Sequence, residues 1–266
     1  SNASKTSGEG RIPFYLRQFS AIGHYIFVLY MFTSIHSLQN FAMVNGCLLL
    51  FGIMQYNLIQ TCNTFFSFFP FYAKNYALMA FVDYGVSNKP SIHPNLLQTS
   101  TFEFHWYVLI STAVETLTHL CVVNHHTFCE RSLLQDVLWF VPISFVFEIL
   151  FDLFHYTTHR LLHSPHLYKY CHKTHHKFKH PTSIITFYQE PLDLIVTNSI
   201  PTLLALTLTR FVSYRQFHMI LIYKTFIEIC GHCGKYSYPT CSFPQFVWLP
   251  KWLHIELYTE DHDLHH

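Results

Sequence analysis

Long apolar stretches with almost no charge are the feature that most constrains the fold of this chain. They extend over residues 19–38, 41–59, 102–123 and 134–154, and each is long enough for a helix to cross a bilayer. Half of the 266 residues are hydrophobic and only 12% are charged, whereas a soluble domain carries about a quarter charged residues. The sequence therefore predicts an all-α integral membrane protein, a helical bundle of about four transmembrane helices.

Two further apolar runs follow at residues 192–208 and 211–230. Prolines interrupt the first run, and three charged residues mark the second. These interruptions favour a re-entrant or interfacial helical hairpin over residues 192–230, although two full spans are an alternative. Either arrangement returns the chain to the same side of the membrane.

Histidines, of which the chain has 21, form three clusters at helical spacing. Residues three or four apart in a helix share one face, so each cluster presents several imidazoles in one direction. A single histidine is more often an ordinary core or surface residue, but three such clusters favour a metal site with many nitrogen ligands, which suits iron, zinc or copper. The clusters are His155 and His159, then His172, His175 and His176, and finally His262, His265 and His266.

Three carboxylates lie within the apolar runs, where an ionisable side chain in the membrane costs free energy. Glu148 and Asp152 precede His155 at spacings of four and three residues, so they are candidates to accept the second N–H of a metal-bound histidine. Solvation of a helix end explains them equally well. Glu115 is expected to face other helices and to help them pack.

Charge distribution predicts the orientation. The arm of residues 4–17 and the histidine segment that begins at residue 155 are both basic, which places both on the cytosolic side. We therefore expect an arm over residues 1–18, whose first three residues are typical of a cleaved tag, transmembrane helices over 19–154, and a cytosolic histidine-rich helical cap over 155–266. A net charge of +1 gives no argument for nucleic acid as a partner.

The histidine pattern resembles the fatty acid hydroxylase and sterol desaturase superfamily over about residues 134–266. The resemblance lies in the spacing of three histidine boxes and in one isolated histidine before the last box. The boxes read Asp152-x-x-His155-x-x-x-His159-Arg-x-x-His163, then His172-Lys-x-His175-His176 and His262-Asp-x-His265-His266, and the isolated segment is His232-Cys-Gly.

This resemblance implies a membrane enzyme of the endoplasmic reticulum whose cap holds two iron ions. Such enzymes use O2 to hydroxylate or desaturate a fatty-acyl lipid or sphingolipid, or to oxidise a sterol methyl group. The electrons come from NAD(P)H through a reductase and cytochrome b5, which would be separate partners here. Carried over by position, the ligands would be His155, His159, His172, His175, His176, His232, His262, His265 and His266, supported from outside by Asp152, Glu148 and His163.

Two departures from the family pattern concern the cap. Many members have His-Pro after the second box, where this chain has Glu190-Pro191. A carboxylate can also bind iron, so Glu190 is a possible additional ligand. The chain ends at His266, whereas members of the family continue for a short tail.

Two other functions fit parts of this pattern. A histidine-rich metal transporter or metal-binding membrane protein would also carry histidines near the bilayer, but it should place them near mid-membrane on several spans. A hydrolase that uses zinc as a Lewis acid needs three or four protein ligands per metal, and nine histidines exceed that number. Zinc can still replace iron in such clusters when iron is scarce.

Overall fold

The computed structural model describes residues 36–61, 67–92, 101–236 and 259–265. Every regular element in these ranges is a helix, and the two extended pairings among them are isolated bridges, Ser91 with Lys235 and Cys129 with Ser213. The predicted all-α class is confirmed. Residues 19–35 of the first predicted span lie outside the described residues.

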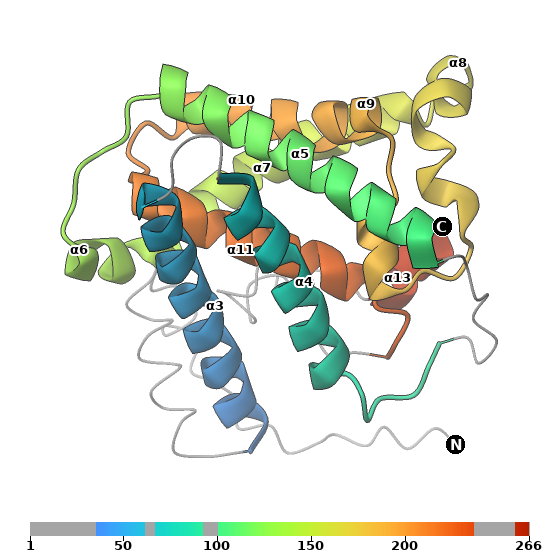
Figure 1. The fold of residues 1–266 in the computed structure, drawn as a ribbon, viewed down its shortest axis with the longest axis horizontal. Helices are drawn as coiled ribbons and strands as arrows, with labels where there is room; N and C mark the ends of the chain where they lie inside the picture. Colours follow the sequence, from blue (N-terminus) through green and yellow to red (C-terminus); the bar gives the residue numbers. More distant parts are fainter. Residues whose placement is uncertain (1–35, 62–66, 93–100, 237–258, 266) are drawn as a thin grey trace, which may run out of the picture.

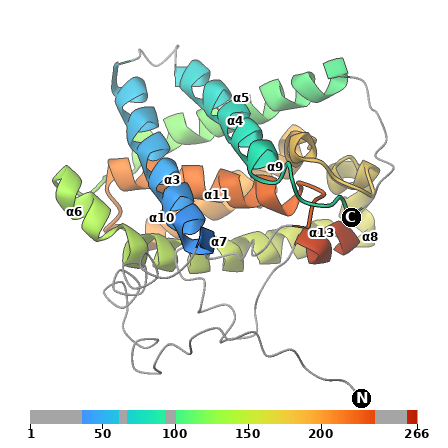
Figure 2. The same cartoon turned by 90° about the horizontal axis from the view of Figure 1, so that it is seen from below.

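The centre of the bundle is α11 (Tyr214–Gly231), which carries many of the most deeply buried side chains. Both α3 (His36–Thr61) and α4 (Phe68–Gly85) pack across it, as Figures 1 and 2 show, and α5 (Thr101–His125) packs against α4. The apolar run 41–59 thus belongs to a helix that begins at residue 36 and packs on the core.

A fourth predicted span, residues 134–154, is divided in the structure. A short helix, α6 (Leu133–Leu138), ends at Trp139, and α7 begins at Phe140 and continues to Leu162. Pro142 explains the break, because it has no N–H to donate to residue 138 and its ring would clash with that carbonyl. The long helix therefore starts later than predicted, and it includes His155 and His159.

Three helical stretches are long and apolar enough to cross a membrane among the described residues: Phe102–His125, Phe140–Leu162 and Pro191–Leu208. The last consists of α9 (Pro191–Leu194), the π-helical η5 (Ile195–Ser199) and α10 (Ile200–Leu208) in direct succession. The two arms of the predicted hairpin over 192–230 pack chiefly on different partners, since α10 packs on α7 whereas α11 packs on α3 and α4. By length and composition, the first arm fits a span as well as it fits an interfacial helix.

Short elements gather at one end of the bundle, near α8 and α13 in Figure 1, and three of them carry histidines of the second and third boxes: His172, His175, His176, His262 and His265. Their bounds are α8 (Pro165–Leu167), η2 (Tyr168–His172), η3 (His175–Lys177), η4 (Ser183–Phe187) and α13 (Thr259–His265). This end of the bundle positions the site.

Buried polar contacts join the helices of the core. Lys74 of α4 pairs with Glu115 of α5 and donates a 3.0 Å hydrogen bond to Thr225 of α11. Asn75 also donates to Thr112 of α5, at 3.1 Å. Glu115 thus faces other helices as predicted, and breaking such a buried pair would leave an uncompensated charge.

Two glycines of α3 give a matched test of the packing on α11. A Cβ on Gly52 would lie 2.7 Å from the Cα of Met219, whereas a Cβ on Gly46 would meet nothing within 4 Å. We expect Gly52→Ala to destabilise the fold by about 1–3 kcal/mol through this overlap and Gly46→Ala to leave it unchanged or slightly more stable. Thermal unfolding in detergent measures both, and equal midpoints for the two variants would contradict the close packing.

Candidate metal centre

Four histidines form the first histidine group. They are His159 and His163 at the end of α7, His172 at the end of η2, and His176 in η3, and their ligand atoms all lie within 4.8 Å of one another. The Nε2 atoms of His159 and His163 are 3.1 Å apart, and those of His172 and His176 are 3.0 Å apart. His265 of α13 adjoins the group, since its Nε2 lies 3.0 Å from that of His159.

Three more histidines form the second histidine group: His175 of η3, His232 after the end of α11, and His262 of α13. The Nε2 atom of His232 is central, at 3.0 Å from that of His262 and 3.5 Å from that of His175. His172, His175 and His176 lie close in sequence but divide between the two groups, so the second box contributes to both.

Hydrogen bonds behind the imidazoles fix which nitrogen carries the proton. His232 donates from Nδ1 to the backbone carbonyl of Glu228 at 2.7 Å, and His155 donates from Nδ1 to the carbonyl of Thr197 at 2.6 Å. The Nδ1 atom of His172 lies 2.8 Å from the carboxylate of Asp193 and donates to it. A neutral imidazole has a single N–H, so the Nε2 atoms of these three histidines carry lone pairs.

Close approach of Nε2 atoms is the chemical signature of the site. In each group an Nε2 atom that carries a lone pair, that of His172 or that of His232, lies 3.0 Å from the Nε2 atom of a second histidine. Two imidazoles on one metal, with bonds of about 2.1 Å at right angles, would place their nitrogens about 3 Å apart. The residues of each group therefore fit a metal ion with nitrogen ligands, of the kind that iron, zinc and copper prefer.

Burial keeps the imidazoles in the form that binds metals. Loss of solvent lowers the pKa of His163 to about 4, with a further contribution from His172 and His265 nearby. Burial likewise lowers the pKa of His265, and it lowers that of His262 well below its usual value. At neutral pH these imidazoles are uncharged, as metal ligation requires.

A cavity of about 200 Å³, the metal cavity, adjoins both groups. His155 lines it and stacks on Phe151 at 5.5 Å between ring centroids, but it does not belong to either group. Glu148 and Asp152 also line this cavity. The other histidines in its wall are His159, His172, His175, His232 and His262.

Two sequence predictions differ from the placement in the structure, and a third concerns a residue that the structure does not describe. His163, expected to support the ligands from outside, lies within the first histidine group. Glu190 lies in neither group, and its carboxylate accepts hydrogen bonds from Tyr107 at 3.2 Å and Thr174 at 3.1 Å. His266 lies outside the described residues.

Sequence reasoning missed the acceptors behind the imidazoles. Asp193, which is fully buried, could have been found as an acidic residue in an apolar run, two residues after Pro191. The carbonyls of Thr197 and Glu228 leave no sequence signal, because any residue supplies one. Thr197 lies in the π-helical η5, and such local widening is frequent at functional sites.

The hydrogen bond between Asp193 and His172 generates a prediction. Asp193→Asn should weaken metal retention about 10–100-fold, because the neutral amide holds the imidazole less firmly and makes it less basic. Titration of the metal-loaded protein with a chelator measures this loss. Glu190→Gln is the matched control, three residues away, and should retain metal like the wild type; a greater loss in Glu190→Gln than in Asp193→Asn would reverse the assignment.

Comparisons with known proteins agree with the histidine pattern. Residues 144–266 match the fatty acid hydroxylase family. Among the relatives, fatty acid hydroxylase domain-containing protein 2 of Homo sapiens is 30% identical over 118 residues, which cover 44% of this chain and 34% of that protein. The fatty acid hydroxylase vlmA of a Lecanicillium species is 32% identical over 139 residues, 48% of this chain and 36% of that protein.

A sterol enzyme is also similar. The C-4 methylsterol oxidase erg25 of Schizosaccharomyces pombe is 28% identical over 135 residues, 49% of this chain and 41% of that protein. The chain thus spans about a third to two fifths of the length of these relatives. No solved structure is significantly similar to it. The chain therefore carries, in residues 144–266, a domain of the fatty acid hydroxylase family.

Proposed function

We propose that this protein is a membrane-bound oxygenase that uses two iron ions and O2 to oxidise a C–H bond of a lipid. The observation that carries the proposal is the convergence of imidazole nitrogens into two histidine groups around one cavity. The names of the relatives, which include fatty acid hydroxylases and a methylsterol oxidase, support a lipid as substrate. Hydroxylation, desaturation and oxidation of a sterol methyl group all remain within this class.

The chemistry of the donor set favours a redox metal. Acid–base side chains cannot break an unactivated C–H bond at neutral pH, and bound iron would supply the activation of O2 that this step needs. All seven side chains of the two groups are imidazoles. A magnesium site would instead offer oxygen ligands.

The residues of this chain would hold and orient the centre. Asp193 and the carbonyl of Glu228 fix His172 and His232, one in each group, with Nε2 directed at the metal position. The carbonyl of Thr197 does the same for His155 at the wall of the metal cavity. Preorganised ligands of this kind raise metal affinity, because little ordering remains to be done on binding.

The histidine groups lie at the end of a candidate membrane span, and this location supports a lipid substrate. Phe140–Leu162 is apolar enough to cross a bilayer, and its last turns carry His155 and His159. A lipid could then stay in the membrane while its reacting carbon enters the metal cavity. We further propose that this end faces the cytosol at the endoplasmic reticulum and that cytochrome b5 and its reductase deliver electrons from NAD(P)H.

Metal analysis of purified protein tests the proposal group by group. After expression with added iron, we expect about two irons per chain, and removal of either group should abolish at least one of them. The variants are His172→Ala with His176→Ala for the first group, and His175→Ala with His232→Ala for the second. His166→Ala, an exposed histidine between the boxes, is the control and should keep both ions.

A wild-type protein that holds no transition metal after expression with added iron would contradict the proposal. Metal content that survives both double variants would show that the ions bind elsewhere. Zinc in place of iron would support the histidine groups, and reconstitution with ferrous iron, a reductase system and lipid would then test the oxygenase.

A further inference from the structure

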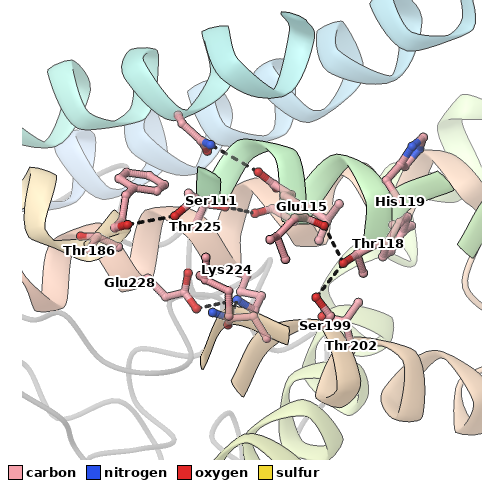
Figure 3. A pocket seen from close by; sticks show the side chains of 17 residues that line it. Ser111, Glu115, Thr118, His119, Thr186, Ser199, Thr202, Lys224, Thr225 and Glu228 are labelled. Carbon is pink, nitrogen blue, oxygen red and sulfur yellow. Dashed lines mark hydrogen bonds and ion pairs between the residues drawn. The ribbon is translucent and has the colours of Figure 1, made fainter. Parts of the chain in front are cut away.

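A second cavity of about 80 Å³, the inner cavity, lies beside the metal cavity in the core of the bundle. Helices α5 and α11 and the η5–α10 segment enclose most of it, as Figure 3 shows. Four residues line both cavities: Thr186, Asn198, Lys224 and Glu228. The two spaces therefore meet at these side chains, and one molecule that reaches past them would occupy both.

Polar groups without partners face the inner cavity. Thr202 is only 4% exposed, lines the cavity, and its hydroxyl makes no hydrogen bond with the residues that the structure describes. Asn198 accepts a 2.7 Å hydrogen bond from Lys224 through Oδ1, and its NH2 has no partner in the described part of the chain. A buried hydroxyl that stays unsatisfied, such as that of Thr202, is costly. The amide of the half-buried Asn198 offers donors beside it, so these groups indicate a polar occupant.

Ser199 adds an acceptor beside them. Thr118 donates its hydroxyl proton to the carbonyl of Val114, at 2.8 Å, so the 2.6 Å contact between Thr118 and Ser199 takes its proton from Ser199. The oxygen of Ser199 keeps its lone pairs. The wall next to Thr202 thus offers both donors and an acceptor.

The charges of the inner cavity are already balanced. Lys224 pairs with Glu228 within one helix, and Lys74 pairs with Glu115 across two helices. A carboxylate or phosphate placed here would be a surplus negative charge among buried groups, which is unfavourable without a free cation. The lining therefore accepts a polar group only if that group is uncharged.

We propose that the inner cavity binds the uncharged polar group of the lipid substrate, a hydroxyl or an amide, through Thr202 and Asn198. This inference rests on the proposed function, in which the hydrocarbon next to that group enters the metal cavity. A bare hydrocarbon would leave both side chains unsatisfied, and an anion would unbalance the charges. A hydroxyl or amide can both donate and accept, so it matches the groups available.

Binding of two lipids of equal chain length tests the inference. The probes are radiolabelled 1-hexadecanol and hexadecanoate, added to the purified, iron-loaded full chain in detergent. We expect the alcohol to bind at least about tenfold more tightly. Thr202→Val should weaken binding of the alcohol about five-fold, the effect of one lost hydrogen bond, while Thr202→Ser should bind like the wild type.

Thr207→Val is the matched control for the loss of a hydroxyl. Thr207 lies on the same helix, is exposed, and donates to the carbonyl of Leu204, so this variant should bind the alcohol normally. A similar loss of affinity in both valine variants would indicate a general effect on α10 rather than a contact with the ligand.

A charge variant tests the selection against anions. Glu228→Gln leaves Lys224 without its carboxylate, while the backbone carbonyl of residue 228 still accepts from His232. The preference should then shift toward hexadecanoate by about tenfold or more. Glu103→Gln, which removes a carboxylate from the exposed pair with Lys177, is the control and should leave the preference unchanged.

Several results would overturn the inference. They are equal or tighter binding of hexadecanoate by the wild type, an unchanged affinity in Thr202→Val, and an unchanged preference in Glu228→Gln. A protein that holds its metals but binds neither lipid would show that the inner cavity holds only water, and would leave the metal assignment standing. A protein that holds no metal would contradict the proposed function, whether or not it binds either lipid.

Discussion

The hydrogen bonds behind the imidazoles are the interaction on which the site depends. By holding the Nδ1 proton of His172, His232 and His155, the acceptors Asp193 and the carbonyls of Glu228 and Thr197 direct the Nε2 lone pairs inward. The lone pairs of His172 and His232 lie about 3 Å from the Nε2 atom of a second histidine, the separation that two ligands of one metal would have. Because this arrangement exists only in the folded chain, the fold and the metal are expected to stabilise each other.

The core helix α11 connects this site with the rest of the bundle. It packs on α3 and α4, it contributes Lys224 and Glu228 to both cavities, and it ends at Gly231, directly before His232. A shift of α11 would therefore change packing, cavity shape and metal geometry together. This dependence explains why a small residue such as Gly52, far from the histidines in sequence, bears on the position of the site.

Sequence and structure agree most where a pattern repeats. The histidine boxes predicted a metal centre with many nitrogen ligands, and the apolar runs predicted an all-α bundle. The prediction that each box presents its histidines in one direction is wrong for the second box, because His175 lies in a different group from His172 and His176. The break at Trp139 follows from Pro142 and could have been predicted from local rules. Spacing could not show that His172 and His175 belong to different groups, because that division depends on the irregular η2 and η3 segments. Backbone acceptors such as Thr197 carry no signature at all, and the acceptor role of Asp193 depends on a contact across 21 residues.

The central claim is that imidazole nitrogens of the two groups bind the metals, and X-ray absorption at the iron edge of the loaded protein tests it most directly. The account predicts a first shell dominated by nitrogen at about 2.1 Å, with the multiple scattering of several imidazole rings beyond it. A first shell of sulfur, which the buried thiols of Cys230 and Cys233 could supply, or a shell of oxygen without imidazole scattering would contradict it.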